Sequence, residues 1–474
     1  MIILGTNSIK DTGYNVANSC RFNRGDSPSL VKDQSASPTH DDKGTLSFWF
    51  KIANLSSGDG HYFFSVFTDS NNRMQMLLQS DGTLKLLQKT GGSTVINLVT
   101  NRVFRDVSTW YHLVLACDSS QGTAANRIKI YINGVQESSF STETYCNQDV
   151  DIQLVKGTEV CLGAYNKASP SDFFDGYLAE MVLIDGTQNA VTDFGEFDED
   201  SPTIWKPKDV SGLTFGTNGF YLDFEDSANL GNDANGGTDF TENNLAATDQ
   251  SIDTCTNNFA TMNPLDNYYA ASVFSEGNTT VDMNVSGNET YNTSTIGVSK
   301  GKWYAEVKLV DSSTKPMTGI VANHPVAIGT VLGNTGHGVA YMGEDGKYKT
   351  NSTNNTYGTT YTTNDIISIA LDLDNNKLYF AKNNSWQNSG DPTSGSTGTG
   401  AISITAPSST ATGAYFFAAG KRHSDNNKVS WNFGSPPYSV SSGNADGNGY
   451  GNFEYAPPSG YLALCTKNLG SDGG

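Results

Sequence analysis

The chain has 474 residues and a net charge of −20, with 16% charged residues, 11% aromatic residues and 49 glycines. The negative charge repels phosphate and argues against nucleic-acid binding, and the aromatic content argues against intrinsic disorder. No apolar run approaches the length of a transmembrane helix. The first residues show neither the basic nor the apolar segment of a secretion signal, so we expect synthesis in a cytoplasm.

Alternation of apolar and polar residues dominates the first part of the chain. Asp81-Gly82 and Asn133-Gly134 follow such runs and predict tight hairpins, because both turn residues must accept positive φ. Strands of this length and spacing predict a β-sandwich over residues 18–190, after a lead segment over residues 1–17. The expected strands cover 45–52, 62–67, 74–79, 83–87, 110–117, 127–132 and 176–184.

The middle of the chain, residues 191–270, is poor in such runs and rich in acid. Residues 171–240 hold 15 acidic residues and 2 lysines, so their net charge is −13. We interpret residues 191–270 as an acidic, irregular connector. The acid predicts a cation-binding or subunit-docking zone that chelators would loosen.

A second set of alternating runs predicts a second β-sandwich over residues 271–469, followed by a flexible tail over residues 470–474. The low-complexity stretch 388–400 predicts a mobile loop. The fold class is therefore all-β, with two sandwiches. The expected strands of the second set cover 302–310, 325–329, 338–342, 365–373, 377–381, 415–419 and 428–433.

Catalytic and metal-binding motifs are weak. Glycoside hydrolases use paired carboxylates, and the one similar pattern here, Glu196-Phe197-Asp198-Glu199-Asp200, lacks a flanking apolar strand. We interpret it as a solvated acidic loop and predict that the protein is not an enzyme. The Asp372-x-Asp374-x-Asn376 pattern starts like an EF-hand loop, but Lys377 and Asn383 replace the required Gly and Glu, which excludes that site.

The spacing of the cysteines and histidines indicates no catalytic or metal-binding motif. Six scattered cysteines are too few for a disulfide scaffold; Cys117 reads as a buried thiol, and a Cys146–Cys161 bridge stays open. The six histidines lack zinc spacing. His112 alternates with Trp110 and is interpreted as a structural residue.

Residues 18–190 resemble the laminin-G-like, concanavalin A-like jelly rolls. Related jelly rolls often bind calcium at their rim, and the resemblance implies a Ca²⁺ site with Asp172 and Asp175 as candidate ligands. The matching segments are 46–50, 110–114, 130–134 and 174–181, which read LSFWF, WYHLV, IYING and FDGYLAEM.

Residues 271–469 resemble SPRY domains, in which loops form the ligand surface. The matching segments are 301–307, 328–329, 369–372, 376–383, 415–418 and 429–434. Aromatic residues beside Asn, Asp and Gly in loops suit sugars, because they offer a stacking plane next to planar polar groups. The candidate ligand-binding residues of this kind are His337, Tyr341, Tyr348, Tyr357 and Trp386.

The pairing of the two domains, with segments 218–224, 246–250, 254–264 and 458–469, resembles virion proteins of tailed phages, particularly marine ones. The resemblance implies a non-enzymatic virion appendage such as a tail fibre, assembled in a bacterial cytoplasm. It would bind host-surface glycan or neighbouring virion proteins and form a homo-oligomer, without membrane insertion. Two alternatives stay open: a purely structural capsid decoration protein, and a polysaccharide depolymerase.

Overall fold

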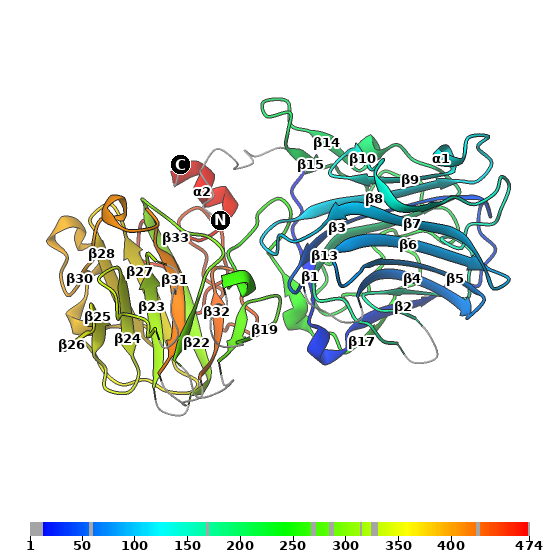
Figure 1. Ribbon diagram of the computed structural model, residues 1–474. Coiled ribbons are helices and arrows are strands. Elements are labelled where there is room, and N and C mark those ends of the chain that lie inside the picture. The colour runs from blue at the N-terminus through cyan, green and yellow to red at the C-terminus, as the bar shows by residue number, and fades with distance from the viewer. Residues whose placement is uncertain are drawn as a thin grey trace. The chain divides into compact units, whose positions relative to one another are not determined.

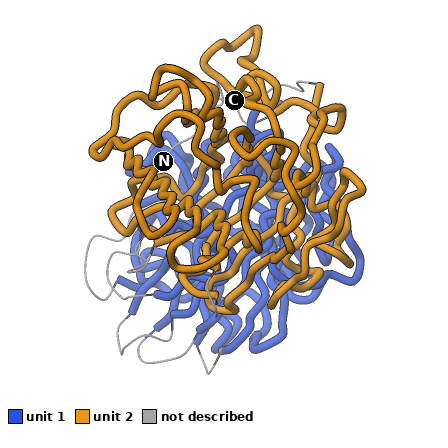
Figure 2. Tube along the Cα trace, turned by 90° about the vertical axis from the view of Figure 1, so that its right-hand side faces the viewer, with its two compact units in different colours: residues 1–10, 257–474 blue, residues 11–256 orange. Residues whose placement is uncertain are grey.

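The computed structural model describes residues 13–55, 60–166, 170–266, 272–283, 289–312, 315–323, 330–422 and 427–472. The chain divides into two compact units, which Figure 2 shows in orange and blue. We call residues 11–256 the N-terminal unit and residues 257–474 the C-terminal unit. Each unit is built from mainly antiparallel sheets (Figure 1), which confirms the predicted all-β class with two β-sandwiches.

Two eight-stranded sheets form the sandwich of the N-terminal unit. The first has the order β10-β9-β8-β3-β13-β1-β18, with β16 also paired to β13, and the second has the order β11-β7-β6-β5-β4-β12-β2-β17. The first contains β1 (Ser19–Phe22), β3 (Lys43–Ile52), β8 (Tyr111–Asp118), β9 (Ile128–Ile132), β10 (Val135–Gln136), β13 (Gly176–Asp185), β16 (Phe220–Leu222) and β18 (Gln250–Ser251). The second contains β2 (Ser29–Asp33), β4 (His61–Asp69), β5 (Asn72–Leu78), β6 (Thr83–Thr90), β7 (Ser93–Val103), β11 (Phe140–Thr144), β12 (Glu159–Leu162) and β17 (Thr241–Asn243).

The C-terminal unit pairs a nine-stranded sheet with a six-stranded sheet. The larger has the order β19-β20-β32-β22-β27-β28-β29, with β30 paired to β28 and β33 paired to β22; the smaller has the order β21-β31-β23-β24-β25-β26. The larger contains β19 (Val273–Ser275), β20 (Thr280–Asp282), β22 (Lys302–Ser312), β27 (Ile366–Asp372), β28 (Lys377–Lys382), β29 (Ser385–Trp386), β30 (Ile402–Ser403), β32 (Asn427–Asn432) and β33 (Leu462–Ala463). The smaller contains β21 (Thr290–Thr293), β23 (Pro316–Val321), β24 (Gly338–Met342), β25 (Tyr348–Thr350), β26 (Thr353–Asn355) and β31 (Phe416–Lys421).

Strand alternation places every second residue in the core between the sheets. On β3, Phe48 and Phe50 belong to the main core of the N-terminal unit, while Trp49 belongs to a separate cluster on the outer face. On β22, Trp303 and Val307 lie in the core of the C-terminal unit. The predicted hairpin at Asn133-Gly134 is confirmed, with φ of 47° and 78° between β9 and β10.

Residues 191–256 correct the predicted connector, because they are part of the N-terminal unit rather than a linker. They supply β16, β17 and β18, which pair with β13, β2 and β1, and they form the small sheet of β14 (Gly195–Phe197) and β15 (Trp205–Pro207). The first predicted domain therefore ends about where β18 ends, and not at residue 190. Long-range strand pairing, which a local pattern does not report, explains the difference.

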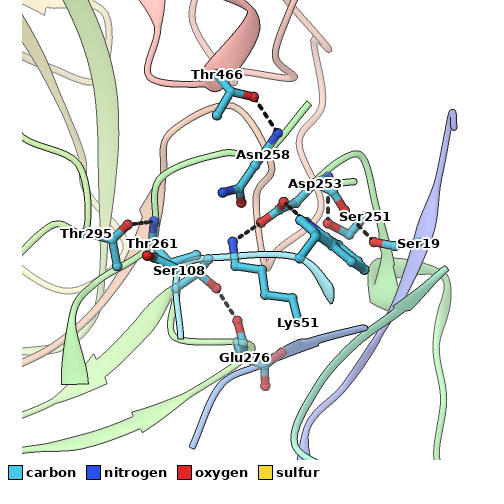
Figure 3. Close-up of polar contacts among 12 residues, drawn as sticks. Ser19, Lys51, Ser108, Ser251, Asp253, Asn258, Thr261, Glu276, Thr295 and Thr466 are labelled. Atoms are coloured by element: carbon cyan, nitrogen blue, oxygen red, sulfur yellow. Dashed lines mark hydrogen bonds and ion pairs between the residues drawn. The ribbon is translucent and has the colours of Figure 1, made fainter. Parts of the chain in front are cut away.

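The outer face of the β3-containing sheet is covered by this late segment. Trp205 Nε1 donates to Nδ1 of His112 at 2.9 Å, and Lys51 Nζ lies 2.8 Å from Oδ2 of Asp253, both side chains being 1% exposed. Figure 3 shows this ion pair, with Ser19 and Ser251 beside Asp253. The late segment is thus fixed by apolar packing and by a buried charge pair.

The stretch 388–400 and the C-terminal tail are more ordered than the sequence predicts. The stretch 388–400 is folded, since Pro392 is buried within a 3₁₀ turn (Pro392–Thr397) and its carbonyl accepts from the Tyr461 hydroxyl at 3.0 Å. Helix α2 (Thr466–Asp472) occupies most of the predicted tail, and a short helix α1 (Ala124–Arg127) precedes β9. The expected strand 325–329 and the lead segment up to residue 12 lie outside the described residues. In the described ranges, no helix has the length and apolar character needed to cross a membrane.

Candidate functional site

A polar cavity of about 360 Å³ lies in the N-terminal unit, beside the end of β2. Three segments far apart in sequence form it: the end of β2 with the loop after it, the turn before β16, and the turn between β16 and β17. One residue of β12 completes the wall. The lining residues are Lys32, Asp33, Gln34, Ser35, Ala36, Val160, Gly216, Thr217, Asn218, Gly219, Asn235, Gly237 and Thr238.

Turn chemistry shapes the walls of the cavity. The Asp33 carboxylate accepts from the backbone N–H of Ser35 at 2.9 Å and from its hydroxyl at 3.0 Å, which turns the chain at the end of β2. Gly216 has a φ of 78°, and a Cβ there would lie 2.2 Å from the carbonyl oxygen of Asp185. A side chain at residue 216 would therefore push this wall apart.

A buried ion pair forms the floor. Lys32 Nζ lies 3.0 Å from Oδ2 of Asp233, with the two side chains 11% and 0% exposed. The ammonium also lies over the rings of Phe220 and Phe240, at 5.7 and 5.4 Å from their centroids. Asp233 Oδ1 accepts from the backbone N–H of Asn235 at 3.2 Å, so the floor also fixes the neighbouring turn.

Two amide side chains line the cavity and differ in how they are satisfied. Asn218 Nδ2 donates to the carbonyl oxygens of Ala36 and Val155, both at 2.9 Å, so this amide positions the walls. Gln34 is 3% exposed, and its Nε2 donates to the carbonyl of Leu154 at 3.2 Å. Within the described part of the chain, Gln34 Oε1 has no hydrogen-bond partner. A buried acceptor of this kind is costly unless a donor reaches it.

The ligand-binding aromatics that the sequence predicted lie in the C-terminal unit and are not equally accessible. Tyr341, 0% exposed on β24, and Tyr357, 5% exposed, belong to the core, whereas the sequence predicts them as ligand-binding residues in or next to loops. Tyr357 also accepts from the backbone N–H of Phe380 at 3.1 Å. Their rings offer no free face to a sugar.

The other three predicted aromatics are half-buried. Tyr348 packs against the same core and meets the Tyr357 ring edge-on, with centroids 5.8 Å apart. Trp386 lies on β29, and His337 directly precedes β24. A ligand role for these three residues stays a prediction.

The predicted calcium ligands lie just before β13. Asp172 accepts from the Ser171 hydroxyl at 2.6 Å, and Asp175 is 7% exposed. In the described ranges, no group of three or more His, Cys, Asp or Glu side chains is arranged to hold a metal ion. A Ca²⁺ site at Asp172 and Asp175 therefore stays a prediction without a visible third ligand of these types.

Turns account for much of the acid in residues 171–240. Carboxylates at turns accept backbone N–H groups and stabilise local reversals of the chain. Such acceptors are Asp193, Asp198, Asp209, Asp223, Asp226, Asp233 and Asp239, whereas Asp185 accepts from the sequence-distant backbone N–H groups of Thr39 and Asn218. The acid thus has a structural role, while cation binding stays a prediction that unfolding in the presence of EDTA tests.

The acidic sequence resembling a hydrolase motif is engaged in ion pairs. Glu196, on β14, and Asp198 lie 3.3 and 3.6 Å from Nζ of Lys206. Glu196 is 48% exposed in its side chain, so a pocket does not enclose it. Glu196 lies on a strand rather than in the predicted loop, and residues 198–200 follow that strand outside it.

His112 and the cysteines are structural. Because Trp205 Nε1 donates to Nδ1 of His112, the ring is neutral, with Nε2 left to donate to the Ser47 hydroxyl at 2.9 Å. Burial lowers the pKa of His112 to about 3. All six cysteines are free and buried, so no bridge joins Cys146 and Cys161.

Comparisons with known proteins identify two domains. Residues 24–190 match the concanavalin A-like lectin/glucanases superfamily, and residues 300–404 match the SPRY domain. The chain therefore contains a concanavalin A-like domain followed by a SPRY domain, as the sequence motifs predicted. No curated protein sequence matches the chain.

Solved structures similar to parts of the chain have low sequence identity. The SPRY domain of human HERC1 is 15% identical, with 36% of this chain and 96% of that chain covered and a TM-score of 0.28. A heptameric SAP-like pentraxin from Limulus polyphemus is 18% identical, with 37% and 80% covered and a TM-score of 0.27. A putative carbohydrate binding protein from Bacteroides ovatus is 17% identical, with 48% and 59% covered and a TM-score of 0.32.

The cavity is the feature that the sequence analysis missed. Most of its lining residues are Gly, Asn, Ser, Thr and Asp, a composition that also marks ordinary loops. The repeated Asn-Gly steps at 218–219 and 235–236 are the available signal, but they do not indicate that the two turns meet beside β2.

Proposed function

We propose that the protein is a non-enzymatic carbohydrate-binding protein and that the cavity beside β2 is its saccharide site. The observation that carries this proposal is a cavity lined by amide, hydroxyl, carboxylate and glycine backbone groups that three sequence-distant segments bring together. Saccharides present many hydroxyls that both donate and accept, so they suit such a lining. The match of residues 24–190 to a superfamily of lectins and glucanases supports the same ligand class.

The absence of an enzymatic role is part of the proposal. Retaining and inverting glycosidases need two carboxyl groups facing one saccharide bond. The carboxylates closest to that pattern in sequence, Glu196 and Asp198, share a lysine on a surface hairpin. Glu196→Gln should leave any reducing-end release from bacterial polysaccharides unchanged from the background.

We further propose that the chain serves as a tailed-phage virion appendage, such as a tail fibre, that binds host-surface glycan and neighbouring virion proteins as a homo-oligomer. The motif resemblance and the pairing of the two domains support this role. Location of the chain on intact particles by cryo-electron microscopy tests it. Density for the chain on the head would favour the capsid decoration alternative, and its absence from particles would overturn the virion role.

Saccharide binding is tested by titrating the full chain with bacterial surface oligosaccharides in a calorimeter. Asn235→Ala removes an exposed amide of the cavity, and Asn147→Ala removes an exposed amide elsewhere in the same unit. We expect Asn235→Ala to weaken binding about tenfold, the effect of one lost hydrogen bond, and Asn147→Ala to have no effect. A tenfold loss of saccharide affinity in Trp386→Ala, with unchanged affinity in Asn235→Ala, would instead place the site in the C-terminal unit.

A further inference from the structure

We propose that the hairpin of β14 and β15 in one copy of the chain docks on the outer face of the β6-containing sheet in a second copy. This inference goes beyond saccharide binding and rests on the proposed homo-oligomer, whose subunit contact it specifies. Three features carry it: an open sheet face with unpaired lysines, a rigid hairpin with an exposed aromatic ring, and opposite charges on the two surfaces.

The outer face of the β6-containing sheet is open in the described part of the chain. Along β6, Leu84 and Leu86 are buried in the core, and Lys85, Leu87 and Lys89 alternate with them and are half-buried. Among the described residues, both apolar clusters outside the main core of this unit lie on the β3-containing sheet. The late segment therefore covers the opposite side of the sandwich and leaves the β6 side available to a partner.

The open face carries positive charge beside apolar side chains. Lys85 lies between Leu77 of β5 and Val99 of β7, and Lys89 lies beside Arg73 of β5. Neither lysine forms an ion pair within the described ranges. In a chain with a net charge of −20, three cations on one sheet face form a local positive patch that favours an acidic partner surface.

The hairpin of β14 and β15 presents an aromatic ring on a rigid base. Phe197 is 41% exposed and packs edge-on against Trp205, with ring centroids 4.9 Å apart. Trp205 is fixed by donation from Nε1 to His112, and it lies so close to Gly195 that a Cβ there would be 2.6 Å from the indole. A ring held in this way loses little conformational freedom when it enters an interface, and aromatic anchors dominate binding energy.

The charges of the hairpin match those of the open face. Glu199 and Asp200 follow Phe197, are exposed, and form no ion pair among the residues that the structure describes. Two unpaired carboxylates beside an exposed ring can thus meet the two unpaired lysines of β6, which flank the apolar Leu87. Opposite charges around an apolar contact select the partner and fix its register.

The two surfaces lie on opposite sides of one sandwich, so a single copy cannot bring them together. Trp205 contacts His112, which stacks on Trp49 on the outer face of the β3-containing sheet, whereas Leu87 belongs to the other sheet. The contact between copies is therefore head-to-tail. Such a contact uses a different surface on each partner, and it closes into a ring or extends as a chain.

The test is sedimentation velocity of the full chain over a concentration series, in which we expect an oligomer. Phe197→Ser and the double variant Lys85→Glu/Lys89→Glu should each weaken association at least about tenfold. Val273→Ser, which removes a 56% exposed apolar side chain of β19, is the control for the first. Lys129→Glu/Lys349→Glu makes the same charge change on β9 and β25 and is the control for the second.

Charge exchange and mixing identify the two surfaces. Adding Glu199→Lys/Asp200→Lys to Lys85→Glu/Lys89→Glu should restore association, which also shows that the charge variant folds. An equimolar mixture of the Phe197→Ser chain and the Lys85→Glu/Lys89→Glu chain should form a 1:1 dimer, because each retains the surface that the other has lost.

The possible outcomes separate this contact from the proposed function. An oligomer of equal stability in all variants would overturn the contact and leave the homo-oligomer standing, whereas a native chain that stays monomeric would overturn both. Binding of an anionic oligosaccharide that is lost in Lys85→Glu/Lys89→Glu, by a chain that stays monomeric, would identify a different occupant and also overturn the contact. The calorimetric titration with Asn235→Ala tests saccharide binding separately, and its failure would leave the contact standing.

Discussion

The two units differ in the buried polar contact that holds a late, irregular segment on the outer face of one sheet. We call this contact the anchor of the unit. In the N-terminal unit the anchor is an ion pair between Lys51 and Asp253, to which Trp110 Nε1 also donates at 3.1 Å. In the C-terminal unit it is the carboxylate of Glu306 on β22, which is 0% exposed.

Neutral donors surround Glu306. The backbone N–H groups of Glu454 and Tyr455 donate to it at 2.9 and 2.7 Å, and the Tyr304 hydroxyl and the Asn432 amide complete the set. Burial nevertheless raises the pKa of Glu306 to about 7, against the effect of these donors. The anchor of the N-terminal unit is thus a pair of opposite charges, whereas the anchor of the C-terminal unit is a carboxyl group that a proton can neutralise.

The comparison teaches that a buried anchor need not stabilise the fold in net terms to be indispensable. Removal of one member of a buried pair leaves the other charge without compensation, whereas removal of both can be close to neutral. A protonatable carboxyl can also avoid the cost of a buried charge, because it loses its charge when the pH falls.

The largest effect is expected at the ion pair. Lys51→Met should lower the free energy of unfolding of the N-terminal unit by about 3–5 kcal/mol, because Asp253 stays buried and charged. Hydrogen exchange measured on peptides from β3 and from β22 assigns the loss to one unit. The double variant Lys51→Met/Asp253→Leu should recover most of the loss, and a single-variant loss below about 1 kcal/mol, as for a surface pair, would contradict the argument.

The next effect is a pH dependence of the C-terminal unit. The folded pKa of Glu306, about 7, lies above its ordinary value of 4.5, so folding takes up a proton between these pH values. The contribution of this proton uptake to the free energy of unfolding is complete below pH 4.5 and is lost as the pH rises through 7. Its full size is about 3 kcal/mol. Glu306→Gln should abolish this pH-dependent part of the stability, which hydrogen exchange of the β22 amides measures. Identical pH profiles for the native chain and the variant would contradict the prediction.

A smaller effect is expected at a second buried carboxyl, Glu180 of β13, in the N-terminal unit. Glu180 has a φ of 50° at a bulge and accepts from the hydroxyls of Tyr221 and Tyr14 at 2.9 and 3.0 Å. Tyr221→Phe should cost about 1–2 kcal/mol, because it leaves the carboxyl with one donor fewer. Denaturant unfolding measures the cost, with Tyr131→Phe, a half-buried tyrosine of the same sheet, as the control.

Reducing agent should have the smallest effect, with no shift in the unfolding midpoint of either unit. Burial raises the pKa of Cys20 and Cys117, and all six thiols are buried and free, so none should react in the folded chain. Five cysteines belong to the N-terminal unit and Cys465 belongs to the C-terminal unit. Thiol labelling during partial unfolding therefore reports which unit opens first, and fewer than six labels after full unfolding would reveal a bridge.

Local sequence patterns are enough to place the strands and to assign their faces. Alternation is a local property, so the expected runs at 45–52 and 176–184 lie within β3 and β13, and turn residues such as Asn133-Gly134 mark the hairpin that forms. The motifs of the two domains are local in the same sense, and the comparisons confirm them.

Only the tertiary structure decided what the loops and the late segments do. Tyr341 is predicted from the sequence to bind a ligand next to a loop, but its ring fills the core. Residues 191–256 are predicted as part of a connector, but their strands pair with β13, β2 and β1. The cavity joins residues 32–36 to two turns beyond residue 215. Such contacts depend on strand pairing across long stretches of chain, and no local period encodes which distant partners a turn will meet.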